Sequence, residues 1–203
     1  MGLLKKLFTN CACPQGRMGG AMLKFMNLCH APLTNWGLKL VGIQDGWTML
    51  DIGCGGGATL QRLLKRSRGA QVYGIDISEE SVAKAKKVNA KVLDKQVFVT
   101  LGSAEKLPYE DGKFDLVTAV ETVYFCPNLP NCLQEVRRVL KSGGKFAILV
   151  EVVDSDSKWT SVVEGMTAYS PEDLKKLLDD AGFTQTEIHR RKPTYATILG
   201  VKK

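Results

Sequence analysis

The feature that most constrains this chain is a short apolar run that ends in a cluster of glycines. The run Leu50-Asp51-Ile52 leads directly into Gly53–Gly57, which holds four glycines around one cysteine, and a helical pattern follows. Glycines at such a turn allow a sharp reversal of the backbone and let a ligand approach it closely. A buried strand, a glycine turn and a helix in this order are typical of a nucleotide site at the carboxyl edge of a parallel sheet.

The next strand-like run ends in an acid, Asp76, which lies 23 residues after Gly53. A carboxylate in this place can accept hydrogen bonds from the two hydroxyls of a ribose, so the sequence predicts a nucleoside site. The glycines do not decide which nucleoside binds, because Gly53, Gly55 and Ala58 also satisfy the dinucleotide fingerprint. A nicotinamide-dependent oxidoreductase is therefore an alternative at this point.

From Trp47 onward, short apolar runs alternate with helical patterns, which predicts an α/β fold built on a parallel sheet. We expect strands at residues 48–52, 71–76, 96–101, 115–120 and 145–153, and helices at residues 59–67, 79–90, 129–140 and 171–181. Two more strand-like runs, at residues 183–190 and 195–201, have no helix between them, so they should pair in antiparallel fashion.

The first 46 residues lack strand signals, and two stretches have helical character, residues 3–8 and 20–28. The second should stop at His30–Pro32, because a proline inside a helical pattern interrupts the helix. We therefore expect residues 1–46 to form a helical lid segment and residues 47–203 to form one α/β domain.

The net charge of +7 lies at the two ends of the chain. Residues 1–47 carry +4 and residues 189–203 carry +5, whereas residues 48–188 carry −2. A slightly acidic central domain gives no case for DNA as a partner. No apolar run reaches the roughly 18–20 residues of a membrane span, so we expect no stable membrane insertion.

The six cysteines are expected to be free thiols, because no secretory signal is convincing and a cytoplasmic location is the default. Cys11 and Cys13, with Cys29 and His30, match no common zinc spacing, so no metal is expected.

Five segments in order resemble the motifs of the class I S-adenosylmethionine (SAM) dependent methyltransferases. They are similar to motif I, the second motif, the adenine-side loop, the fourth-strand motif and the turn into the fifth strand. The segments are Asp51–Gly57, Tyr73–Ser78, Gly102–Tyr109, Phe114–Val117 and Arg138–Gly144. The resemblance covers about residues 47–190 and is strongest to the small-molecule and lipid-quinone subgroup called methyltransferase type 11.

This resemblance implies a Rossmann-like three-layer sandwich with a seven-stranded, mostly parallel sheet. The implied strand order is 3-2-1-4-5-7-6 with the last strand antiparallel. Residues 47–203 would then be a SAM-binding methyltransferase domain, with S-adenosyl-L-homocysteine as the product formed from the cofactor. The implied activity is methyl transfer to a small-molecule acceptor, a class that includes lipid-like and anionic molecules. The oligomeric state is not predicted.

The resemblance also implies roles for individual residues. Gly53 and Gly55 would lie against the methionyl and ribose parts of SAM, and Asp51 would brace the glycine loop. Asp76 would bind the ribose hydroxyls and Ile77 would pack on the adenine.

Two more groups complete the implied cofactor site. Ala104 and Glu105 would line the adenine edge, next to Ser103, which stands where many members have an Asp that contacts the adenine amino group. Glu121, just past the fourth strand, would lie near the methionyl part and the transferring methyl group.

Methyl transfer from a sulfonium needs a dedicated base only when the acceptor arrives protonated, so no catalytic motif is required. His30, Glu121 and Tyr124 are the catalytic candidates. Asn27, Trp36, Phe125, Trp159, Met166 and Tyr169 are further candidates for the acceptor side. An RNA or protein methyltransferase and a non-catalytic SAM-binding regulator remain alternatives.

Overall fold

The computed structural model describes residues 26–152, 166–191 and 194–203. Seven strands form one sheet in the order β3-β2-β1-β4-β5-β7-β6, and β7 runs antiparallel to both of its neighbours. The strands are β1 (Thr48–Ile52), β2 (Gln71–Asp76), β3 (Val97–Leu101), β4 (Phe114–Val120), β5 (Leu140–Glu151), β6 (Phe183–Arg191) and β7 (Tyr195–Lys202). The expected strand order and the antiparallel last strand are confirmed.

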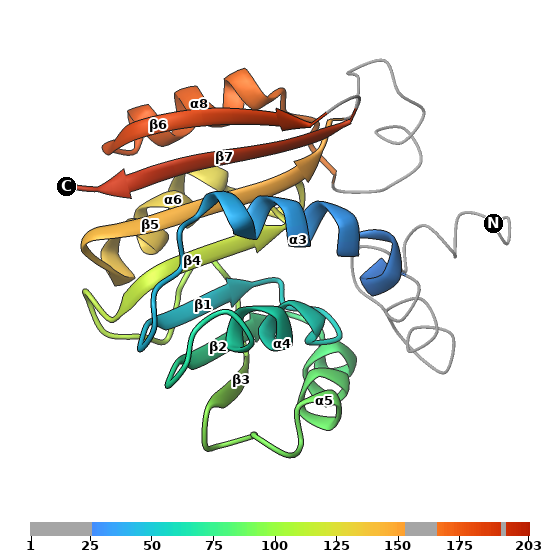
Figure 1. Cartoon of the computed structure of the whole chain (residues 1–203). Helices are drawn as coiled ribbons and strands as arrows, with labels where there is room; N and C mark the ends of the chain where they lie inside the picture. Colours follow the sequence, from blue (N-terminus) through green and yellow to red (C-terminus); the bar gives the residue numbers. More distant parts are fainter. Residues whose placement is uncertain (1–25, 153–165, 192–193) are drawn as a thin grey trace, which may run out of the picture.

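Helices cover both faces of the sheet and make it the middle of three layers (Figure 1). The helices are α3 (Ala31–Leu40), α4 (Ala58–Leu64), α5 (Glu79–Val88), α6 (Leu129–Val139) and α8 (Pro171–Asp180), with a 3-10 turn η1 (Val123–Phe125). Helices α3, α4 and α5 lie on one face, and α6 and α8 lie on the other. Two separate clusters of buried apolar side chains fill the two interfaces.

Capping side chains start the helices at the places that the sequence indicates. The Ser78 hydroxyl accepts the Ser81 N–H at the start of α5, and Ser170 and Asp173 form a capping box at the start of α8. These caps satisfy backbone N–H groups that a helix start leaves without partners. The strand ends and helix starts that frame the site are therefore encoded locally.

The described part of the helix expected at residues 20–28 stops at His30 as predicted, but sequence reasoning missed the new helix that starts directly after it. Residues 26–29 are helical, His30 forms a turn, and α3 begins at Ala31 with Pro32 in its first turn. A proline is tolerated there because the N–H that it lacks would have no partner. The His30 carbonyl accepts both the N–H and the hydroxyl of Thr34, at 2.9 and 2.7 Å, and closes the turn.

Helix α3 packs on the sheet. Leu33, Leu38 and Val41 are buried in the same cluster as Met49 of β1 and Leu149 of β5. The domain boundary at residue 46 and the role of the preceding residues as a lid stay predictions. The expected helix at residues 3–8 lies outside the described residues.

Strand β5 begins earlier than expected, at Leu140 in place of residue 145. Leu140 pairs with Phe114 and Lys145 pairs with Leu116, so the register shifts between these two pairs. Gly143, with φ of 77°, lies within the shift. The segment that ends in Gly143 and Gly144 was expected to be a turn before the strand, and it instead forms an irregularity inside β5.

Candidate functional site

A cavity of about 340 Å³ opens at the carboxyl edge of the sheet, beside the ends of β1, β2 and β4. Such an edge is where ligands bind in open α/β sheets, because the connections that follow the strands surround a crevice. Eight of the nine residues predicted for the cofactor site line the cavity together. They are Gly53, Gly55, Asp76, Ile77, Ser103, Ala104, Glu105 and Glu121.

The glycine loop is fixed by contacts that leave no room for side chains. Gly53 has φ of 66°, and a Cβ atom there would lie 2.4 Å from Cγ2 of Thr122. The Gly55 N–H donates to Oδ2 of Asp76 at 2.8 Å. Oδ1 of Asp76 accepts the Ser78 N–H at 2.9 Å, so this carboxylate joins the loop to the end of β2.

Asp76 retains the capacity to bind further donors, because each carboxylate oxygen has two lone pairs. Burial raises the pKa of Asp76, although the hydrogen bonds from Ser78 and Gly55 oppose this effect. The carboxylate lies on the cavity wall beside Ile77, whose large apolar side chain is 62% exposed. A hydrogen-bond acceptor next to a bare apolar surface suits a ribose followed by a flat base.

The opposite side of this nucleoside region comes from the loop after β3. Ser103, Ala104 and Glu105 line the cavity, and the Ser103 hydroxyl accepts the Glu105 N–H at 3.2 Å. The loop therefore presents backbone and small side chains to a ligand. These features fit an adenosine group, which needs an acceptor for its ribose and surfaces on the two sides of its base.

Glu121 directly follows β4 and has a left-handed backbone conformation with φ of 57°. Such a conformation is unfavourable for a residue with a side chain and tends to occur at functional sites. The Tyr124 hydroxyl donates to Oε2 of Glu121 at 2.7 Å, and the Glu151 N–H donates to Oε1. Burial raises the pKa of Glu121 to about 7, against the effect of both hydrogen bonds.

The three catalytic candidates are placed differently. Glu121 and His30 line the cavity, whereas Tyr124 is not among the lining residues and donates its hydrogen bond to Glu121 from behind the wall. Burial and the positive charge of Arg62 lower the pKa of His30, so its ring is neutral at pH 7. Trp36, a candidate for the acceptor side, packs near Tyr195 and does not line the cavity.

Asp51 lies within the sheet and does not line the cavity. Its side chain is 2% exposed, and Oδ1 accepts the Thr118 hydroxyl at 2.6 Å. Burial raises its pKa to about 7, and the nearby Asp76 carboxylate contributes in the same direction. Its position just before Gly53 fits the expected role of bracing the loop, which stays a prediction.

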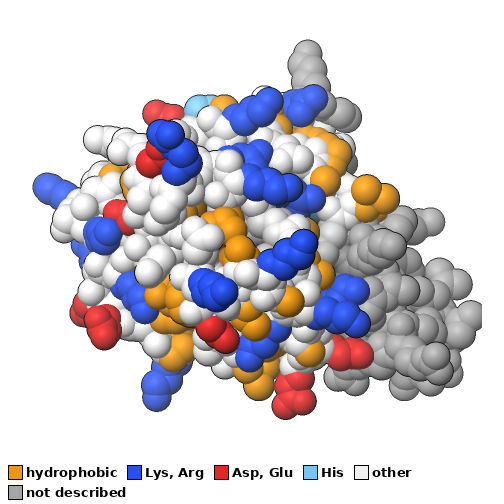
Figure 2. Space-filling model, turned by 60° about the horizontal axis from the view of Figure 1, so that its bottom comes forward, with side chains coloured by type: hydrophobic (Ala, Val, Ile, Leu, Met, Phe, Trp, Pro, Cys, Tyr) orange, Lys and Arg blue, Asp and Glu red, His pale blue; other side chains and the backbone are white. Residues whose placement is uncertain are grey.

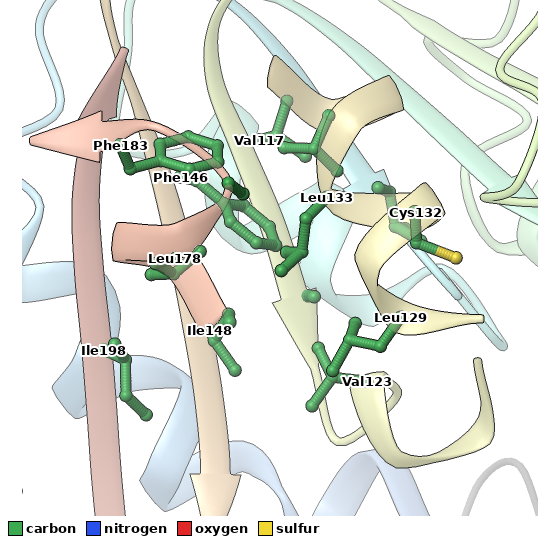
Figure 3. Packing of buried hydrophobic residues seen from close by; sticks show 14 of the residues in the cluster. Val117, Val123, Leu129, Cys132, Leu133, Phe146, Ile148, Leu178, Phe183 and Ile198 are labelled. Atoms are coloured by element: carbon green, nitrogen blue, oxygen red, sulfur yellow. The ribbon is translucent and has the colours of Figure 1, made fainter. Parts of the chain in front are cut away.

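An apolar wall, of which sequence reasoning named only Phe125, completes the cavity. It is formed by η1, by the sheet-facing side of α6 and by one residue of β5: Val123, Phe125, Leu129, Cys132, Leu133, Val136 and Phe146. Figure 3 shows Leu133 of α6 directed toward Phe146 of β5, with Leu129 close to Val123. The helical spacing of Leu129, Leu133 and Val136 indicates a buried face, but nothing in the sequence shows that part of this face borders a cavity.

The expectation of free thiols is wrong for one pair, because Cys126 and Cys132 are joined by a disulfide. Asn128 and Pro130 start α6 between them, which brings the first turn of the helix back toward Cys126. Cys29 is free and exposed, and Cys54 is free and buried.

Metal ligation and membrane insertion were not expected. No three His, Cys, Asp or Glu side chains of the described residues are grouped as metal ligands would be. Cys11 and Cys13 lie outside these residues, so the lack of a metal stays a prediction. None of the described helices has the length and apolarity of a membrane span.

Comparison with known proteins assigns the chain to a family. Residues 50–148 match the family model described as a methyltransferase domain, of the type 11 subgroup. A Synechocystis sp. protein named as an uncharacterized methyltransferase is 35% identical over 165 residues, which make up 75% of this chain and 74% of that protein. The chain belongs to the class I SAM-dependent methyltransferases. This membership decides against the nicotinamide-dependent oxidoreductase.

Other relatives are longer than this chain. The sterol 24-C-methyltransferase ERG6B of Gibberella zeae is 37% identical over 122 residues, which cover 57% of this chain and 32% of the relative. The chain spans between about a third and three fifths of the length of several curated relatives that it matches. The structure of a SAM-dependent methyltransferase from Aquifex aeolicus shares the fold, with a TM-score of 0.71 at 22% identity over 91% of this chain and 98% of that one.

The burial of Asp51 generates a prediction about stability. A carboxyl group whose folded pKa lies above its unfolded value stabilises the fold fully at low pH, and this contribution is lost as pH rises through the folded value. Asp51→Asn keeps an acceptor for Thr118 but cannot ionise. We expect the variant to be more stable than the wild type by about 2–4 kcal/mol at pH 8 and by clearly less at pH 5. Urea unfolding at both pH values measures this difference.

The exposed Glu110→Gln change on the same protein is the matched control and should leave unfolding unchanged at both pH values. A gain for Asp51→Asn that is equal at pH 5 and pH 8 would show that the ionisation of Asp51 does not limit stability.

Proposed function

We propose that this chain transfers the methyl group of SAM to a small, mainly apolar acceptor. The observation that carries the proposal is a single cavity in which a nucleoside region continues into an apolar wall. Asp76, Ile77 and residues 103–105 border the first part, and side chains of η1 and α6 border the second. A mostly apolar crevice with a few placed polar groups is typical of small-molecule sites.

Bound SAM would supply the activated methyl group, so the chain itself has to hold the cofactor and the acceptor, orient them toward each other and keep water out of the site. Asp76 accepts the ribose hydroxyls, Ile77 packs on the adenine, and Ser103, Ala104 and Glu105 border its other edge. Gly53 and Gly55 allow the backbone to approach the cofactor closely. Fixing a donor and an acceptor in a cavity that excludes water lowers the barrier mainly by orientation.

Glu121 has two properties that suit the transfer step. Its carboxylate lies at the end of β4 on the cavity wall, and its pKa of about 7 allows both charge states near neutral pH. When ionised, it stabilises positive charge at the sulfonium and accepts a proton from an acceptor that arrives protonated. The Tyr124 hydroxyl holds the carboxylate in place.

Two observations favour a small acceptor over RNA. Residues 48–188 carry a net charge of −2. On the face shown in Figure 2, Lys and Arg side chains are spread among acidic and hydrophobic ones. A sterol methyltransferase among the relatives has, by its name, an apolar acceptor, which supports the same class here.

A panel of acceptors tests the acceptor class by following S-adenosyl-L-homocysteine release. We expect turnover with small apolar alcohols, phenols or isoprenoids and little with equally small, highly polar molecules, because the apolar wall cannot replace lost hydration. Bulk RNA and a histone-like basic peptide are the comparison substrates. Turnover that occurs only with RNA or peptide would contradict the proposal.

Asp76→Ala tests the ribose contact by calorimetric titration with S-adenosyl-L-homocysteine. Loss of a charged acceptor that bonds to the ribose should weaken binding by well over tenfold, as hydrogen bonds to charged groups contribute about 1.5–3 kcal/mol. Glu79→Ala removes a nearby exposed carboxylate and is the matched control. Equal affinities for Asp76→Ala and the wild type would remove Asp76 from the site.

The pKa of Glu121 predicts how activity depends on pH. Below its pKa the group is protonated and lacks the negative charge that transfer uses, so kcat/KM should rise with pH through about 7. Glu121→Gln should lower kcat/KM by at least about tenfold and flatten this rise. In the wild type, the hydrogen bond from Tyr124 lowers the pKa of Glu121. Tyr124→Phe removes this bond, so the pKa of Glu121 and the rise in kcat/KM should both move to higher pH. An unchanged pH profile in both variants would exclude Glu121 as the titrating group.

A further inference from the structure

The disulfide between Cys126 and Cys132 belongs to the wall of the cavity, because both residues line it. It joins two elements of the apolar wall. Cys126 directly follows η1 and caps it, and Cys132 lies in the first turn of α6. The other two cysteines among the described residues, Cys29 and Cys54, are free. The one cross-link in the described part of the chain therefore ties η1 to α6 beside the cavity.

The fold does not depend on this cross-link. The two cysteines are six residues apart, and a disulfide that closes so short a loop restricts the unfolded chain only slightly. A chain of 203 residues also buries enough apolar surface to fold without cross-links. Helix α6 is held by the buried Leu133 and Val136 and by the hydrogen bond from Nδ2 of Asn131 to the Glu105 carbonyl at 2.9 Å. Opening the disulfide should therefore leave the domain folded and α6 in place.

The element that the disulfide restrains is η1. A 3-10 turn of three residues has little hydrogen bonding of its own, so its surroundings determine its position. It carries Phe125 of the apolar wall and Tyr124, whose hydroxyl bonds to the Glu121 carboxylate. The Thr167 N–H donates to the Tyr124 carbonyl at 2.9 Å and limits how far the turn can move. A small shift of η1 away from α6 would thus alter the wall and the contact to Glu121 together.

The disulfide is placed where a thiol can attack it. Cys126 is partly exposed and is followed by the exposed Pro127 and Asn128, whereas Cys132 is 4% exposed. Figure 3 shows the Cys132 sulfur pointing away from Phe146. An incoming thiolate therefore meets Cys126 first. The first turn of a helix stabilises a thiolate, which makes Cys132 a suitable leaving group.

We propose that Cys126 and Cys132 form a redox switch that controls the position of η1 in the cavity wall. A dithiol reductant attacks Sγ of Cys126, the S–S bond breaks, and Cys132 leaves as a thiolate that takes up a proton. The second thiol of the reductant then attacks the mixed disulfide and releases Cys126 as a thiol. The reductant becomes a disulfide, so two electrons and two protons pass to the protein. The oxidised state holds η1 against α6, and the reduced state releases it.

Hydrogen exchange in the two redox states tests the switch without a known acceptor. The protein is equilibrated at pH 7 with mixtures of reduced and oxidised dithiothreitol, and alkylation followed by mass measurement gives the disulfide content. Reduction should leave the circular dichroism spectrum unchanged. It should raise exchange rates at residues 122–128 by at least about fivefold, because the N–H groups of Phe125 and Cys126 bond within this turn. Exchange at residues 71–78, on the nucleoside side, should change by less than about twofold.

Two variants serve as matched controls. Cys126→Ala/Cys132→Ala is permanently open, so its exchange at residues 122–128 should be high without reductant and should not respond to it. Cys11→Ser/Cys13→Ser/Cys29→Ser retains the pair and removes three other cysteines, so it should respond as the wild type does. If the open variant fails to fold, the dithiothreitol series on the wild type decides.

The functional consequence rests on the proposed function, because it takes the apolar wall as the acceptor side. Reduction should raise KM for an acceptor that is turned over by at least about threefold. It should change the affinity for S-adenosyl-L-homocysteine by less than about twofold, since the nucleoside region lies on other loops. Equal KM values in the two states would overturn the control of the acceptor side.

The remaining outcomes separate the switch from the proposed function. A disulfide that dithiothreitol opens only as the protein unfolds would overturn the switch, because the bond would then be a structural cross-link. Equal exchange at residues 122–128 in both states would overturn it as well. Binding of S-adenosyl-L-homocysteine in neither state would instead refute the proposed function, and the exchange data would still decide whether the pair moves η1.

Discussion

The glycine loop is held against the ends of three strands, and the geometry of the whole site depends on this contact. The N–H groups of Gly53 and Cys54 both donate to the Ile75 carbonyl, at 2.8 and 3.1 Å. On the other side, Thr122 fills the space that a side chain at Gly53 would need. The loop after β1 is thus clamped between the ends of β2 and β4. This contact determines where Asp76 and Glu121 lie relative to the backbone that a ligand approaches.

Two carboxyl groups on the cavity wall and a third one in the adjoining sheet lie in surroundings that disfavour their charge. Burial is the largest cause of the raised pKa of Asp51, Asp76 and Glu121. Each of them has hydrogen-bond donors that offset part of this cost, from Thr118, Gly55 or Tyr124. Buried acids that lower the stability of a protein in the absence of its ligand are commonly found where function requires them. A cationic ligand would compensate them, which connects the stability of this edge to its ligand.

Most of the fold could be predicted from the sequence, because the signals are local. Apolar runs, glycine turns and caps such as Ser78 act within a few residues. The strand order of the sheet was implied by the resemblance of the five ordered motifs to those of the family. Two features could not be predicted from local signals. Pro32 gives the same local signal whether a helix ends or starts at it. The start of β5 at Leu140 follows from the pairing of Leu140 with Phe114, which is distant in the sequence.

The site was predictable to a different degree in its two halves. The nucleoside half is made of loop residues that follow strands, so their motifs showed that they would meet. Arg62, which lines the cavity, sits in a run of helix residues, and its sequence context does not separate it from an exposed arginine such as Arg68. Only the packing of residues 26–30 against α4 reveals its position. The same holds for the wall formed by α6, whose apolar spacing looks like ordinary core.

The pKa of Glu121 also bears on how the site tolerates a change in the charge of its ligand. Under the proposed function, methyl transfer would replace the cationic sulfonium of SAM with the neutral thioether of the product, so a carboxylate that had faced the sulfonium would lose its counter-charge. A carboxylate with a low pKa would then be left ionised and uncompensated in a poorly hydrated site. Glu121, whose pKa is about 7 in the free protein, can take up a proton at little cost near neutral pH. Under the proposed function, one group thus favours the charged cofactor before transfer and tolerates the neutral product after it.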